Sequence, residues 1–204
     1  WRNSLGMNLK PVGNILVAEY ETTLGIYKQF VAATDPKNKS VETTFTQGDD
    51  HPVVNVRIGQ TREFCKWLTK VEREKQLIQP NHLYRLPTDE EWSIMAGLEN
   101  EKGTFPMARD SQIKGIYPWG TAWPPPPGTG NFKDAALGTA LGQKKNILAS
   151  INDGFVRTAP VGKFKPNKYG LYDLAGNVWE FVNDDYSVSY THLTLPTTCA
   201  VLFA

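Results

Sequence analysis

The feature that most constrains the fold is the second half of the chain, where helical periodicity disappears after Asn100. The segment from residue 101 to 185 is punctuated by turn-forming runs such as YPWG, WPPPPG, NDGF and LAGN. Long stretches without regular structure are uncommon in compact domains, and those that occur are mostly functional. We therefore expect buried aromatic side chains or bound ions to order this half of the domain.

The first half of the chain carries the regular structure. Residues 12–21 are rich in β-branched and aromatic residues and lead into two threonines, which predicts a strand followed by a helix. A short strand is expected at 53–56. Apolar residues at helical spacing predict a second helix over 59–76, with Phe64, Leu68 and Val71 on one face.

A third helix is expected where the chain leaves a short strand at 83–87. Thr88 and Glu91 have the spacing of a capping box, in which each side chain bonds the backbone N–H of the other residue. This pattern predicts a helix that starts at Thr88 and runs to about residue 98. Two strand-and-helix units followed by a long irregular half indicate a loop-rich α+β domain.

Charge excludes some classes of partner. The 204 residues include 22 Lys+Arg and 21 Asp+Glu, for a formal net charge of +1. A near-neutral chain without a basic block is not expected to bind nucleic acid or an anionic membrane through bulk electrostatics. No apolar stretch approaches the ~18 residues that a membrane span needs. We therefore expect no nucleic acid and no membrane among the partners.

Residues with obvious catalytic patterns are absent from the sequence. The three histidines, His51, His82 and His192, are not spaced as metal ligands, and no GxSxG elbow, P-loop or dinucleotide-binding loop is present. Cys65 lies between Phe64 and Trp67 within the second predicted helix, where a small buried residue is the usual role. We assign no catalytic residue.

Oxygen-bearing side chains beside glycines are more informative. Asn131, Asp153, Asn177 and Glu180 all lie close to glycine in the irregular half. Calcium takes six to eight oxygen ligands from carboxylates, amides and backbone carbonyls. The alternative is that Asn-Gly and Asp-Gly pairs simply form turns.

Several motifs together resemble one known family. They are SLGMNLKPVG, VAEYETTLGIYKQFVAAT, HPVVNV, FCKWL, YRLPTDEEW, YPWG, GNF, DGFVRTAPVGKF and PNKYGLYDLAGNVWEF. Over residues 4–186 the chain resembles the formylglycine-generating enzyme (sulfatase-modifying factor) family. The resemblance implies a C-type-lectin-like α+β fold with about three helices and short strands. It also implies oxidation of a sulfatase cysteine to formylglycine, with O2 and copper held by two cysteine thiolates.

The same resemblance implies two structural calcium sites. The first would use the side chains of Asn131 and Asp153 with the carbonyls of Phe132 and Phe155. The second would use the side chains of Asn177 and Glu180 with the carbonyl of Val178. We expect calcium at these positions, because hard oxygen donors recur where the family places them.

The chain departs from the family after Tyr186. The family's copper-binding cysteine pair is missing, and Cys199 has no partner at a suitable spacing. We expect residues 1–186 to be an incomplete family domain that is unstable and inactive. Residues 187–204 carry no charge, and we expect a non-native or frame-shifted tail there, although a real apolar strand is the alternative. Copper and a sulfatase cysteine peptide would belong to the intact parent only.

A second function stays open from the sequence. The domain would then be a non-catalytic lectin-like module that binds a peptide or another ligand, because a fold does not fix a function. A third, a non-heme iron oxidase, is disfavoured by the scattered histidines. A cysteine pair encoded beyond residue 186 would favour the first function over the second.

Overall fold

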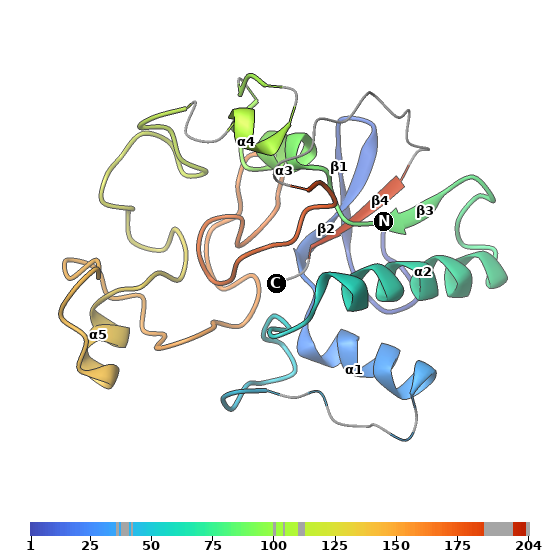
Figure 1. The fold of residues 1–204 in the computed structure, drawn as a ribbon, viewed down its shortest axis with the longest axis horizontal. Coiled ribbons are helices and arrows are strands. Elements are labelled where there is room, and N and C mark those ends of the chain that lie inside the picture. The colour runs from blue at the N-terminus through green and yellow to red at the C-terminus, as the bar shows by residue number, and fades with distance from the viewer. Residues whose placement is uncertain are drawn as a thin grey trace.

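The computed structural model describes residues 1–35, 37, 41, 43–99, 101–103, 105–109, 113–185 and 198–202. Its elements in chain order are β1 (Leu9–Val12), β2 (Ile15–Glu21), α1 (Leu24–Thr34), α2 (Ile58–Glu74), β3 (Leu83–Arg85), α3 (Asp89–Met95), α4 (Pro106–Arg109), α5 (Ala135–Leu141) and β4 (Thr198–Leu202). The sheet, α1 and α2 lie together, and the loop-rich segment with α5 extends to the other side (Figure 1). The described part of the chain holds no helix long and apolar enough to cross a membrane.

One sheet with the strand order β1-β2-β4-β3 organises the regular half. β1 and β2 form an antiparallel hairpin in which Leu9 pairs with Ala18. β4 lies between β2 and β3 and runs parallel to both, with Cys199 opposite Leu16 on one side and Tyr84 on the other. β4 (Thr198–Leu202) is therefore one of the two central strands of the sheet.

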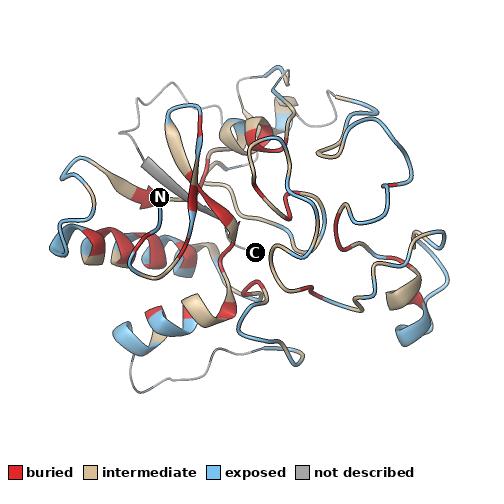
Figure 2. Cartoon of the chain, turned by 180° about the vertical axis from the view of Figure 1, so that it is seen from behind, coloured by how far each residue is buried: buried red, intermediate tan, exposed pale blue. Residues whose placement is uncertain are grey.

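The main core lies between the sheet and the two long helices. Phe64 and Leu68 of α2 are fully buried. The Phe64 ring centroid lies 5.5 Å from that of Phe30 and 6.2 Å from that of Tyr27, both on α1. Burial of each large side chain of this kind contributes about 1.5–3 kcal/mol. Buried residues concentrate on the sheet and the inner faces of these helices, whereas α5 is drawn mostly as intermediate and exposed (Figure 2).

A second, smaller cluster joins the irregular half to the sheet. It consists of Val12 and Val17 from the hairpin, Met95 from α3, and Leu171 and Leu174 from the loops. The loop residues Leu171 and Leu174 are 1% and 6% exposed. This cluster packs the loop residues Leu171 and Leu174 against Val17 of β2.

The three helices expected from the sequence are confirmed as α1, α2 and α3. The capping box is also present: Glu91 N donates to Thr88 Oγ1 over 3.1 Å, and Thr88 N donates to Glu91 Oε2 over 2.8 Å. Arg85 forms two further bonds to the Glu91 carboxylate. The mixed α+β class is confirmed.

Some local expectations are wrong. Residues 53–56 form no strand, because Asn55 has a φ of 61° that breaks the extended run. The strand expected at 12–21 is confirmed as β2, which starts at Ile15, whereas its hairpin partner β1 before the turn at Gly13 was missed. The described residues contain five helices rather than about three, because α4 and α5 are too short to show periodicity.

The expected boundary at residue 186 stays a prediction. Residues 187–197 and 203–204 lie outside the described residues, while residues 198–202 form β4. The structure therefore places the backbone of part of this segment in the sheet.

Candidate functional site

The irregular half is held together where two loops approach each other closely. A Cβ atom on Gly130 would lie 2.1 Å from the carbonyl oxygen of Ala175, and one on Gly176 would lie 2.2 Å from that of Asn131. Asn177 N donates to the Asn131 carbonyl oxygen over 2.8 Å across this contact. Only glycine at both positions leaves room for this approach, since distances below 3.0 Å are not tolerated by a real side chain.

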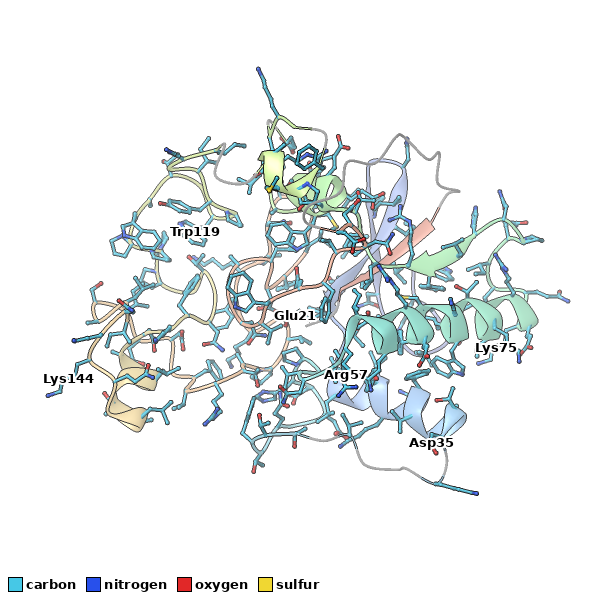
Figure 3. The ribbon with its side chains drawn as sticks, in the orientation of Figure 1. Glu21, Asp35, Arg57, Lys75, Trp119 and Lys144 are labelled. Atoms are coloured by element: carbon cyan, nitrogen blue, oxygen red, sulfur yellow. The ribbon has the colours of Figure 1, made fainter. Side chains whose placement is uncertain are left out.

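The loop contact brings two of the expected calcium ligands together. Asn131 Nδ2 donates to Asn177 Oδ1 over 3.1 Å. Asn177 Nδ2 in turn donates to Glu21 Oε2, at the end of β2, over 2.7 Å. The Asn177 side chain thus connects both loops to the sheet, and Glu21 lies near the centre of the molecule (Figure 3).

Buried carboxylates surround this connection. Glu21 is 1% exposed and Asp173 is 5% exposed. Glu180 accepts a hydrogen bond from the indole Nε1 of Trp92 on α3. One oxygen of each carboxylate is sealed from solvent and has no hydrogen-bond partner: Glu21 Oε1, Asp173 Oδ1 and Glu180 Oε1. Buried polar groups without partners are costly, and a proton or a cation on these carboxylates would lower that cost.

Burial is also the main reason that these groups are weak acids. Desolvation, together with the charge of Asp173, raises the pKa of Glu180 to about 8. Desolvation raises the pKa of Glu21 well above its usual range, and the nearby Glu180 and Asp173 raise it further. The amide of Asn177 and the backbone N–H of Val178 act in the opposite direction on the pKa of Glu21, because they stabilise its anion.

The other expected ligands form a second, adjoining network. The Asp153 carboxylate accepts the backbone N–H of Phe132 over 2.7 Å and that of Phe155 over 2.8 Å. Asp153 N donates to Asp134 Oδ2 over 2.5 Å. Asp134 is fully buried and also caps α5. Burial raises the pKa of Asp153.

Asp153 therefore bonds two residues predicted for the first site, Phe132 and Phe155, through their backbone N–H groups. Asn131, in contrast, bonds Asn177 of the second predicted site. The structure places Asn177 and Val178 beside Glu21. The charge of Glu180 raises the pKa of Glu21. Among the described residues, no three His, Cys, Asp or Glu side chains converge closely enough to hold a metal ion by themselves. Any calcium site here must therefore draw on amide and backbone oxygens as well as carboxylates.

Sequence reasoning missed Glu21, Asp134 and Asp173. Val17, Glu19 and Glu21 alternate along β2, but two acids on one face of a strand are typical of an exposed face, and only the structure shows that all three are buried. An acid on the inward face of a strand requires a partner in the fold. Asp134 and Asp173 carried no comparable pattern, since both lie in loops.

The cysteine and histidine residues show no catalytic arrangement in the described part of the chain. Cys65 is 3% exposed, and desolvation raises the pKa of its thiol to about 12. His51 Nδ1 lies 2.9 Å from Thr158 Oγ1, and the backbone carbonyl of His82 accepts two bonds from Arg73. His192 lies outside the described residues, as does the side chain of Cys199. The expected core position of Cys65 is confirmed.

Comparison with known proteins identifies the class. Residues 11–202 match the family model described as "Sulfatase-modifying factor enzyme 1-like domain". The chain therefore belongs to the sulfatase-modifying factor family that the motifs indicated. The match includes β4.

Individual relatives agree with this assignment. The chain is 32% identical over 152 residues to the bovine formylglycine-generating enzyme, covering 74% of this chain and 31% of that protein. It is 31% identical to the formylglycine-generating enzyme of Thermomonospora curvata, covering 76% and 41%. It is also 33% identical to the bovine "Inactive C-alpha-formylglycine-generating enzyme 2", covering 69% and 35%. The matched region spans about a third of the length of these curated relatives.

A solved structure shares the fold. PvdO from Pseudomonas aeruginosa superposes with a TM-score of 0.52 over 89% of this chain and 67% of that one, at 21% sequence identity. This similarity shows a common fold and nothing about activity.

The close approach of the two loops can be tested by adding one methyl group. We expect Gly130→Ala to lower the free energy of unfolding by about 1–3 kcal/mol, because its Cβ would meet the carbonyl oxygen of Ala175. Gly59→Ala on α2 is the control, since a Cβ there meets nothing within 4 Å. Urea unfolding measures both variants. Equal stability of the two would contradict the proposed contact.

The raised pKa values of the buried carboxylates predict how the free energy of unfolding depends on pH when a chelator is present. A raised pKa means that the folded state holds protons that the unfolded chain has already released. The stabilisation is complete below the ordinary value of 4.5 and is lost as the pH rises through about 8. We therefore expect stability to fall between about pH 5 and about pH 8, by on the order of 1 kcal/mol per pH unit.

Glu180→Gln should reduce this loss, because a neutral amide at this position does not titrate. Glu74→Gln, at an exposed position on α2, should leave the loss unchanged. The measurement is the urea midpoint as a function of pH. A wild-type midpoint that rises across this interval would rule out the proposed protonation.

Proposed function

We propose that the parent of this chain oxidises a cysteine in a sulfatase to formylglycine, with copper and O2, and that these residues form its scaffold. The family match over residues 11–202 carries this proposal. Relatives that bear the name formylglycine-generating enzyme support it, at 32% and 31% identity. A C-type-lectin-like arrangement is part of the same proposal, supported by the small mixed sheet and the long irregular loops.

The copper chemistry is not proposed for the residues described here. Copper(I) prefers two accessible thiolates, and the Cys65 thiol is buried among core side chains with a pKa of about 12. Cys65 therefore does not fit the metal. We propose that the 204-residue chain is inactive as an oxidase.

A second candidate is a non-catalytic binding module on the same scaffold. The similarity to the bovine protein named inactive C-alpha-formylglycine-generating enzyme 2 favours it, at 33% identity. The two candidates differ in what the full-length protein does to a thiol.

Calcium is the cation that we propose for the loop region. Glu21 Oε1 and Glu180 Oε1 are sealed from solvent without partners, and hard oxygen donors of this kind suit calcium. We propose that Asn177, the carbonyl of Val178 and Glu180 hold one ion together with Glu21. Asn131, Asp153 and the carbonyls of Phe132 and Phe155 are proposed to hold another. Bound calcium would neutralise the carboxylates and fix the loops to β2.

The oxidase proposal is tested on the full-length protein encoded by the gene. The protein is loaded with copper(I) and incubated in air with a sulfatase-type cysteine peptide, and a hydrazide probe detects the aldehyde. We expect aldehyde from the full-length protein and none from the 204-residue chain. Peptide binding without aldehyde formation would favour the non-catalytic module instead.

The calcium proposal predicts a stabilisation by the ion. At about 100 times its dissociation constant, calcium should raise the free energy of unfolding by about 2.7 kcal/mol per site. Glu180→Gln should remove the response of one site and Asp153→Ala that of the other, whereas Glu74→Gln should keep both. Thermal unfolding with calcium and with chelator measures the effect. An unchanged melting temperature on chelation would contradict the calcium proposal.

A further inference from the structure

A groove beside α2 has no assigned role. It lies between α2 and β3 and has a volume of about 620 Å³. One wall is a row of basic side chains on α2, Arg62, Lys66, Lys70 and Arg73, at one residue per helical turn. The other wall carries Leu83 and Leu86, and Glu74 is an acidic residue in the lining.

The basic row is exposed, while the residues beneath it belong to the core. Arg62, Lys66, Lys70 and Arg73 all face solvent, whereas Cys65 and Thr69, between them on the helix, are buried and line the groove. Leu86 is 1% exposed. The groove therefore combines a cationic rim with an apolar base.

Hydrogen bonds to backbone carbonyls fix both ends of the basic row. Arg62 Nη2 donates to the carbonyl of Asn183 over 3.2 Å, and Arg73 Nη2 donates to that of His82 over 2.8 Å. These bonds place the two guanidinium groups without neutralising them. Lys70 makes only a long surface contact of 3.8 Å with Glu74, which contributes little. Lys66 forms no ion pair with the described residues.

Charge and shape together define the ligand. The chain as a whole carries a formal charge of only +1, so this concentration of positive charge on one groove is local. From Arg62 to Arg73 the row covers about 17 Å at the rise of an α-helix. An extended peptide of about five residues spans the same length. Alternate side chains of such a peptide point to opposite sides, so acidic residues can face the rim while apolar residues face the base.

We propose that this groove binds an extended acidic peptide segment of a partner protein, in which acidic and apolar residues alternate. The site is independent of the proposed oxidase function and of the calcium sites. Its cations steer an acidic segment to the groove, and burial of the apolar side chains retains it.

The experiment measures fluorescence anisotropy of a fluorescein-labelled peptide with alternating Glu and Leu, added to the 204-residue protein. We expect saturable binding that weakens markedly as the salt rises from about 50 mM to about 300 mM. A matched Lys-Leu peptide should not bind, because its charge is reversed. A Glu-Ser peptide should bind about tenfold more weakly, because it buries no apolar side chain.

Charge reversal locates the site. Lys66→Glu with Lys70→Glu should weaken binding of the Glu-Leu peptide by about tenfold or more. The matched control is Lys144→Glu with Lys145→Glu, which makes the same change in net charge. Lys144 lies near α5, at the opposite end of the molecule from Lys75 at the end of α2 (Figure 3). This control should retain most of the affinity.

Three outcomes would overturn the proposal. Equal losses in the two double variants would show that only net charge matters. Equal binding of the Glu-Leu and Glu-Ser peptides would show that the apolar base is not used. Tighter binding to anionic lipid vesicles or to a DNA oligonucleotide, lost in Lys66→Glu with Lys70→Glu, would assign the groove to a membrane or a nucleic acid instead. Circular dichroism confirms that each variant is folded.

Discussion

The irregular half of this protein depends on the hydrogen bond between the amide of Asn177 and the carboxylate of Glu21. Asn177 lies on a loop that passes within contact of the loop at Asn131, and Glu21 lies at the end of β2. This short chain of polar contacts joins three segments that are far apart in sequence. The apolar cluster around Leu171 and the bond from Tyr172 N to the Glu19 carbonyl oxygen hold the same loop to β2.

The buried carboxylates around this connection have an unfavourable electrostatic environment. The charge of Asp173 raises the pKa of both Glu21 and Glu180, Glu180 raises that of Glu21 further, and each of the three has an oxygen without a partner. Charged carboxylates in such a position repel one another and lose their hydration. Protons relieve this in acid and a divalent cation would relieve it at neutral pH, so the same residues account for both the expected pH response and the proposed calcium.

Much of the regular half could be predicted from the sequence, because its signals are local. The capping box at Thr88 and the apolar face of α2 follow from spacing alone, and both are present. The family resemblance was confirmed by the comparisons. The strand expected at 53–56 failed because a single left-handed residue, Asn55, ended it. The role of Glu21 also escaped prediction, because its partner Asn177 lies 156 residues away in sequence.

The position of β4 has a consequence for the order of folding. β2 and β3 are not neighbours in the sheet; residues 198–202 separate and join them. During synthesis the sheet therefore remains in two pieces until the ribosome has made almost all of these residues. Pairings between such distant segments form slowly, and until β4 is made the edges of β2 and β3 that pair with it have no strand beside them.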